Sequence, residues 1–136
     1  MSPAQRDAFL RETRIATLVT LQAGGAPTAV PVWFEWDGKT IQVFTSRRSA
    51  KIARIRSDAR VCLAVAEPVG VPEAWVTVEG TASIEDEGGM ELARRLAARY
   101  YTPDRAAAAL ASWERQADEW VVIRITPTRI ASTGPA

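Results

Sequence analysis

Residues 14–65 read RIATLVTLQAGGAPTAVPVWFEWDGKTIQVFTSRRSAKIARIRSDARVCLAV, and most of the sequence evidence for the architecture lies here. Three of its runs are rich in β-branched and aromatic residues, which favours β-strands. A Gly-Gly turn separates the first two runs, and Asp37-Gly38 between the second and third is a strong β-hairpin signal. The strands are expected at residues 14–21, 28–36 and 39–45. Consecutive hairpins of this kind predict an antiparallel sheet.

The rest of the chain adds strands and places helices at the connections. Ser2-Pro3 is typical of a helix start, and Ser49 can cap a second, short helix. The apolar run over 59–67 predicts a strand that is buried on both faces. Helices are expected near residues 3–13, 49–58, 90–100 and 105–116, with further strands at 74–86 and 119–126 and a short edge at 128–132. About six strands with helices only between them indicate a mainly β fold, an antiparallel β-barrel with peripheral helices.

Composition limits the function. The 136 residues are 47% hydrophobic with a net charge of +1, which predicts one globular domain over residues 1–136. The absence of His and the single Cys rule out histidine triads, Cys–His dyads and ordinary zinc sites, so no metal site is expected. A near-neutral charge disfavours nucleic acid as a partner. No apolar run is long enough to span a membrane and no export signal is evident, so we expect no membrane partner and a cytoplasmic protein.

The segment VFTSRRSAKIARIR, residues 43–56, is the first candidate site. It carries a predicted strand into a helix that begins near Ser49, and free N–H groups at a helix start bind phosphate well. Basic and hydroxyl side chains cluster around that start: Ser46, Arg47, Arg48, Ser49, Lys51 and Arg54. The alternative interpretation is a solvated basic helix with an ordinary serine cap.

The segment AVPVWFEW, residues 29–36, is the second candidate site. Pro31 interrupts a strong strand pattern, which fits an edge strand, a bulge or a place where something other than a strand meets the backbone. Trp33, Phe34 and Trp36 offer flat apolar surface beside it, suited to a planar ring system. The alternative is that these aromatic residues are core and dimer contacts. Tyr100-Tyr101 could also line a pocket, although their helical spacing first predicts packing.

The order of these pieces resembles the flavin-binding split β-barrel family, which includes pyridoxamine-phosphate-oxidase-like proteins and deazaflavin-dependent reductases. Residues 14–65 and WVTVEGTASI at 75–84 carry the resemblance, with a looser match over 119–132. The resemblance implies a homodimer of split barrels with two identical cofactor sites at the subunit interface. It places the cofactor ring against Pro31, Val32 and Trp33, and the cofactor phosphate at Thr45, Ser46, Arg48, Ser49, Ala50 and Lys51.

Two departures from the family bear on the cofactor. Pyridoxamine phosphate oxidases carry a basic segment on the second strand and an Arg-Lys pair at the helix start, whereas TAVPVWF has no basic residue and Ala50 precedes Lys51 here. The sequence looks more like the branch that uses coenzyme F-420, an 8-hydroxy-5-deazaflavin with a phosphate and an oligoglutamate tail. Arg47, Arg48 and Arg54 could receive that tail through charge-assisted hydrogen bonds.

The resemblance implies an enzyme that transfers hydride from the reduced deazaflavin to an unsaturated small molecule. Trp75, contributed by the neighbouring subunit, is expected to wall the substrate pocket, and no residue is assigned as the catalytic acid. FMN is the alternative cofactor, with an oxidase or reductase activity. A further alternative is a protein that binds a flavin, haem or tetrapyrrole without turnover. Fold alone does not decide among these functions.

Overall fold

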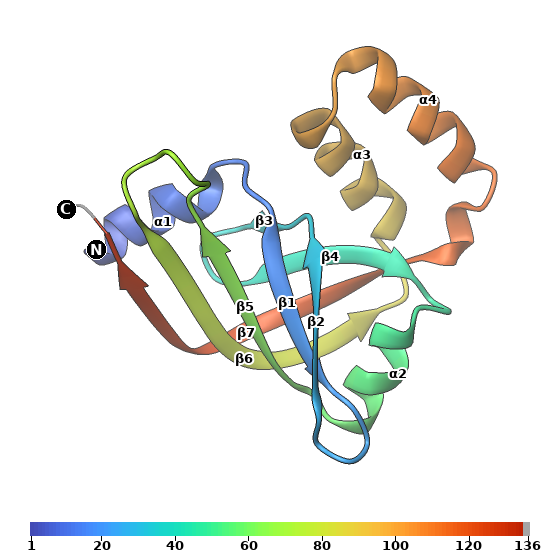
Figure 1. Ribbon diagram of the computed structural model, residues 1–136. Helices are drawn as coiled ribbons and strands as arrows, with labels where there is room; N and C mark the ends of the chain where they lie inside the picture. Colours follow the sequence, from blue (N-terminus) through green and yellow to red (C-terminus); the bar gives the residue numbers. More distant parts are fainter. Residues whose placement is uncertain (135–136) are drawn as a thin grey trace.

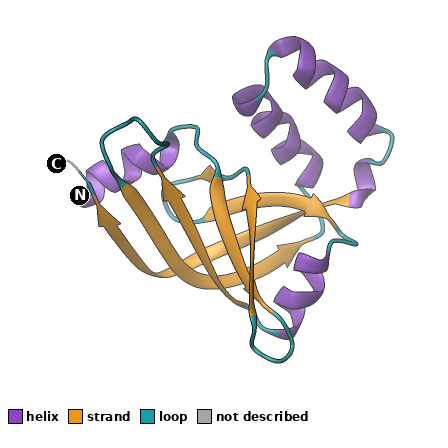
Figure 2. Cartoon of the chain, in the orientation of Figure 1, coloured by secondary structure: helices purple, strands orange, loops and turns teal. Residues whose placement is uncertain are grey.

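The computed structural model describes residues 1–134, which form one curled antiparallel sheet with helices at its connections (Figures 1 and 2). The strands are β1 (Ala16–Leu21), β2 (Pro27–Val32), β3 (Glu35–Trp36), β4 (Ile41–Ser46), β5 (Arg60–Ala66), β6 (Trp75–Glu85) and β7 (Trp120–Thr133). The helices are α1 (Pro3–Arg11), α2 (Ala50–Ser57), α3 (Gly89–Tyr100), α4 (Pro103–Glu114) and the 3-10 turn η1 (Ala117–Glu119). Across these residues, no helix combines the length and the apolar character that crossing a membrane requires.

The strand order is β2-β1-β5-β6-β7-β4-β3, so β2 and β3 are the two edges of the sheet. The sheet curls but these edges do not pair, which leaves a split barrel and confirms the predicted fold class (Figure 1). There are seven strands because the predicted strand over residues 28–36 is divided at Trp33-Phe34 into β2 and β3. The predicted short edge at 128–132 is the continuation of β7.

The local signals at the helix starts and the hairpin act as expected. Ser2 and Gln5 form a reciprocal capping box on α1, and Ser49 caps α2 by accepting from the Lys51 N–H at 3.3 Å. Gly38 has a φ of 94°, which the Asp37-Gly38 turn requires and which other residues rarely adopt. These short-range interactions set the ends of α1, α2 and the β3–β4 hairpin.

The core lies on the inner face of the curled sheet. Its fully buried side chains include Leu18, Phe34, Ile41, Ile52, Leu63, Val78 and Ile123. The strands β6 and β7 shift register between Glu79 and Gly80, and a Cβ at Gly80 would stand 2.3 Å from the Thr126 carbonyl oxygen. This bulge lets the two longest strands bend around the core (Figure 1).

The prediction that the strand at 59–67 is buried on both faces is wrong. In β5, Val61, Leu63 and Val65 are buried, whereas Cys62 and Ala64 are half-exposed on the outer face. Side chains of a strand alternate between the two faces of the sheet, and among residues 1–134 only the inner face of β5 is covered. The outer face of β5 is therefore a small-residue surface open to contact.

The helices α3 and α4 stand together as a hairpin beside β4 and β7 (Figures 1 and 2). Leu92, Leu96 and Val122 form a second, smaller core there, separate from the main one. Partly buried Trp33, Phe44 and Tyr100 pack against it, so this cluster connects the helical hairpin to β4 and to the bend that follows β2.

Candidate functional site

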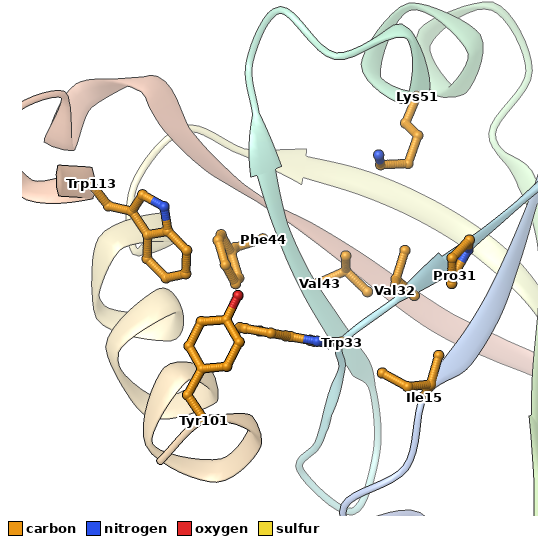
Figure 3. Close-up of a pocket in the computed structure, with 9 residues that line it drawn as sticks. All are labelled: Ile15, Pro31, Val32, Trp33, Val43, Phe44, Lys51, Tyr101 and Trp113. Atoms are coloured by element: carbon orange, nitrogen blue, oxygen red, sulfur yellow. The ribbon is translucent and has the colours of Figure 1, made fainter. Parts of the chain in front are cut away.

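A cleft of about 520 Å³ lies between the edge strand β2 and β4, with α2 at one end and the α3–α4 hairpin at the other (Figure 3). The residues that line it are Ile15, Pro31, Val32, Trp33, Val43, Phe44, Lys51, Tyr101 and Trp113. This volume is in the range of small-molecule sites, roughly 300–1,000 Å³. The cleft joins the two candidate segments of the sequence in one site.

The β2 side of the cleft is a free strand edge. Pro31 pairs with Thr17 and Val32 with Ala16 in the β1–β2 ladder, and within the described residues 1–134 no strand pairs with the other edge of β2. This confirms that the proline marks an edge strand, the place in a sheet where a missing N–H is tolerated. The predicted ring-binding residues Pro31, Val32 and Trp33 all line the cleft.

Lys51 supplies the charge of the cleft. It lies in the first turn of α2, its side chain is half-buried, and its ammonium points into the space above Val32 and Val43 (Figure 3). Among the ion pairs of residues 1–134, none involves Lys51. Burial, with repulsion from Arg54, lowers the pKa of the Lys51 ammonium. An unpaired, partly desolvated cation over an apolar floor favours an anionic ligand group.

Two of the predicted phosphate ligands hold a carboxylate of this chain. The Ser46 hydroxyl donates to a Glu119 carboxylate oxygen, and the Arg48 Nε donates to the same oxygen at 2.8 Å. These hydrogen bonds lower the pKa of Glu119, whose side chain is 17% exposed. Glu119 reaches this turn because β7 pairs Trp120 with Ser46. The Ser46 hydroxyl and the Arg48 Nε are thus occupied by Glu119, whereas the rest of the exposed Arg48 guanidinium has no hydrogen-bond partner among residues 1–134.

The other predicted basic ligands also have partners within the chain. Arg54 donates from Nε to the Thr20 hydroxyl at 2.8 Å, which turns its guanidinium toward β1. Arg47 donates to the Asp118 carbonyl at 2.8 Å and contacts Asp86 at 3.3 Å. Neither arginine lines the cleft.

Three predicted residues have other places in the fold. Thr45 is buried within β4, where it pairs with Val121, and Ala50 is the exposed first residue of α2. Trp75 begins β6 opposite Ala66, is 36% exposed, and does not line the cleft of its own chain.

The far end of the cleft is aromatic. Trp33 meets Tyr101 edge to face at a centroid distance of 4.7 Å and an interplanar angle of 87°, and Trp113 lies 5.5 Å from Phe44. Figure 3 shows the four rings gathered opposite Lys51. Edge-to-face packing of this kind fixes ring orientations. The cleft is thus polar at the α2 end and aromatic at the α3–α4 end.

The remaining aromatic candidates belong to the core. Phe34 is fully buried, and Trp36 is buried with its indole N–H donating to Asp7 at 2.9 Å. For Phe34 and Trp36 the packing interpretation is correct. Of the three aromatic residues in this segment, only Trp33 lines the cleft.

Sequence reasoning missed several cleft residues: Ile15, Val43, Phe44 and Trp113. Trp113 carries a usable signal, because it is one large aromatic residue in an alanine-rich helix. Ile15 is 53% exposed despite its size and apolar character, which only the structure reveals. No cluster of metal-ligating side chains occurs within the described residues 1–134.

The open curled sheet, with a cleft at its edge that is lined in part by Lys51, has the architecture of a split-barrel protein. The chain belongs to the pyridoxamine 5'-phosphate oxidase family, whose sequence model matches residues 2–134. No curated protein matches the sequence.

Several solved structures are similar to the chain. A conserved hypothetical protein of Mycobacterium tuberculosis is 26% identical with a TM-score of 0.77, covering 98% of this chain and 85% of its own. An F-420 reductase is 20% identical with a TM-score of 0.73, covering 92% of this chain and 94% of its own. A FAD-binding protein of Mesorhizobium loti is 21% identical with a TM-score of 0.67, covering 97% of this chain and 92% of its own. The last two likenesses show the common fold.

Proposed function

We propose that this protein is an oxidoreductase that binds coenzyme F-420 in the cleft and transfers hydride to an unsaturated small molecule. The observation that carries the proposal is the arrangement of Lys51 at one end of an apolar cleft whose side wall is the free edge of β2. A phosphorylated planar ring system matches both features, since the phosphate pairs with the cation and the ring lies along the backbone edge. The F-420 reductase among the similar structures supports the same choice.

Different residues of the cleft fit different parts of such a cofactor. Lys51, with the start of α2 at Ser49 and Ala50, would hold the phosphate, and Pro31, Val32 and Trp33 would pack beside the ring. When bound, the reduced cofactor supplies a hydride. The protein supplies position, and its aromatic end keeps water from one side of the acceptor. The proton that completes the reduction comes from water or from a hydroxyl of the substrate.

FMN is the alternative cofactor, because it shares the phosphate and a planar tricyclic ring. The deazaflavin differs by its anionic tail, which Arg47, Arg48 and Arg54 would receive on the outer side of α2. Two of these three are exposed, as a tail contact requires, although Arg48 also pairs with Glu119. A carrier that binds a flavin or tetrapyrrole without turnover would use the same cleft.

We also propose that the active form is a homodimer. The outer face of β5 presents half-exposed Cys62 and Ala64, and Trp75 at the start of β6 adds a 36% exposed indole. A second copy of the chain would cover this surface. In that assembly Trp75 of the partner subunit would wall the substrate pocket. Analytical ultracentrifugation checks the dimer, and a monomer at micromolar concentration would contradict it.

The test of the function is a titration of the purified apoprotein with coenzyme F-420 and, in parallel, with FMN, followed by fluorescence at low and high salt. We expect tight F-420 binding that weakens with salt because the tail contacts are exposed, and weaker FMN binding. Tighter FMN binding would assign the protein to the flavin alternative. Absence of binding by both would overturn the proposal.

A further inference from the structure

Tyr100, the last residue of α3, makes three contacts that converge on the wall of the cleft without lining it. Its hydroxyl donates to the Arg14 carbonyl at 2.6 Å and accepts from the Phe34 N–H at 3.3 Å. Its ring stacks on Trp33 with a centroid distance of 4.8 Å and an interplanar angle of 7°. One side chain therefore connects α3 to two separate backbone segments.

Both backbone contacts fall where the strand ladders end. Arg14 lies just before the start of β1 and Phe34 just after the end of β2, so neither group has a ladder partner. The hydroxyl of Tyr100 satisfies both groups at once. Leaving a buried Phe34 N–H unpaired would be unfavourable, which ties this hydroxyl to the local backbone geometry.

Each of these backbone groups is next to a residue that lines the cleft. Ile15 follows Arg14, and Trp33 precedes Phe34. The stacked ring of Tyr100 further fixes the indole of Trp33, which in turn meets Tyr101 at the aromatic end. The β1–β2 ladder ends at the Ala16–Val32 pair, and Tyr100 bridges the two segments just beyond it, so its contacts hold Ile15 and Trp33 in place on this side of the cleft.

We infer that Tyr100 is a positioning residue that holds Ile15 and the Trp33 indole, beyond the end of the β1–β2 ladder, where they can contact a planar ring in the cleft. This inference rests on the proposed function, because it concerns the same ring site. Burial raises the pKa of the Tyr100 hydroxyl, so the hydroxyl keeps its proton at neutral pH and can donate to the Arg14 carbonyl throughout.

The experiment compares Tyr100→Phe with Trp36→Phe. The first variant keeps the ring stack and removes both hydrogen bonds. The second removes the hydrogen bond of a buried aromatic residue that does not line the cleft, the 2.9 Å contact from the Trp36 indole N–H to Asp7, and so controls for a general loss of stability. The dissociation constants for FMN and coenzyme F-420 are measured, together with the emission that remains when each protein is saturated. Amide hydrogen exchange at Phe34 is followed in the apoproteins.

We expect Tyr100→Phe to weaken ring binding by about five- to tenfold, the equivalent of one or two neutral hydrogen bonds. The saturated complex should emit more strongly, because the bound ring is held less closely against Trp33, and the Phe34 amide should exchange faster. Trp36→Phe should stay within about twofold of wild type in affinity, because Trp36 lies outside the cleft. General destabilisation alone would leave the emission of the saturated complex unchanged.

If wild type binds a cofactor and Tyr100→Phe shows the same affinity and the same emission, this inference is overturned and the proposed function still stands. Wild type binding neither cofactor would overturn both. If Tyr100→Phe does not fold, the test uses the wild-type protein. Coupling between the ring site and the Tyr100 contacts is reciprocal, so a saturating cofactor must slow hydrogen exchange at the Phe34 amide. Exchange that is insensitive to bound cofactor would contradict the positioning role.

Discussion

The two ends of the cleft are built in different ways. The α2 end comes from one continuous segment, in which β4 runs into α2 within a few residues. The α3–α4 end combines Trp33, Phe44, Tyr101 and Trp113 from four separate parts of the chain. At the first end most of the basic side chains are paired within the molecule, and one cation faces the cleft.

The residues of a local sequence motif are therefore not the same set as the residues that line the site. A basic helix start supplies many charges, but the fold assigns most of them to Glu119, Asp86 and Thr20. The aromatic end is not one continuous segment, yet Trp33, Phe44, Tyr101 and Trp113 supply four of the nine residues that line the cleft. We therefore expect the α2 end to control anion affinity through Lys51 and the aromatic end to control ring contacts.

The strongest test of this comparison is Lys51→Met, which removes the cation and keeps most of the apolar stem. We expect FMN and F-420 affinity to fall by about 10- to 100-fold, the value of a charge-assisted hydrogen bond. Lys39→Met is the matched control, because Lys39 is exposed in the β3–β4 turn. This variant should bind both cofactors as tightly as wild type. Titration by fluorescence measures both variants.

The same variant should not lose stability. The Lys51 pKa is lowered in the folded protein, so the charged form is less favourable there than in the unfolded chain. Lys51→Met should therefore have a thermal midpoint at or above that of wild type. A large drop in this midpoint would show that Lys51 has a structural role and would weaken its assignment to the ligand.

Raising the pH should have the next largest effect on the α2 end. The pKa of Lys51 lies below its ordinary value of 10.5, and an anion binds the protonated form. Affinity should fall as the pH rises through the lowered pKa, approaching about tenfold per unit above it. Lys51→Met should show no such decline. An equal decline in both proteins would assign the titration to another group.

At the aromatic end, Trp113→Leu should weaken ring binding by about three- to tenfold, since aromatic contacts contribute roughly 0.5–1.5 kcal/mol. It removes ring contacts to Trp33, Phe44 and Trp120 and should also lower the free energy of unfolding. Leu110→Ala on the same helix controls for loss of α4 stability. The affinity of Trp113→Leu for inorganic phosphate should equal that of wild type. An equal loss of phosphate affinity would show that the two ends of the cleft do not act independently.

The smallest expected effect is a gain. Glu119→Gln weakens the hold on Ser46 and Arg48, so both can turn to a cofactor phosphate, and affinity should rise by about two- to fivefold. Asp118→Asn removes the same formal charge, but Asp118 contacts Arg47 through its backbone carbonyl and should leave affinity nearly unchanged. Isothermal titration measures both, and a loss of affinity in Glu119→Gln would show that Glu119 supports the site.

Much of the fold could be predicted from the sequence, because its signals are short-range. The serine caps, the Asp37-Gly38 turn and the alternation in β6 depend on neighbours within a few residues. The division of residues 28–36 into two strands could not be predicted, because the bend at Trp33-Phe34 is held by Tyr100, 66 residues away from Phe34. Half-burial of β5 was also missed, since its outer residues are small and apolar like a core strand.

Within the site, the sequence pattern points to the segments that meet a ligand: Pro31 to Trp33 on an edge strand, and Lys51 at a helix start. Which of their side chains are free to do so depends on contacts between parts of the chain that are far apart in sequence. Ser46 and Arg48 are held by Glu119, 73 and 71 residues further along the chain, and Trp113 reaches the cleft because α3 and α4 pack beside β4. The physical reason is that charge pairing and aromatic packing act through space, whereas caps, turns and strand alternation act between neighbours in sequence.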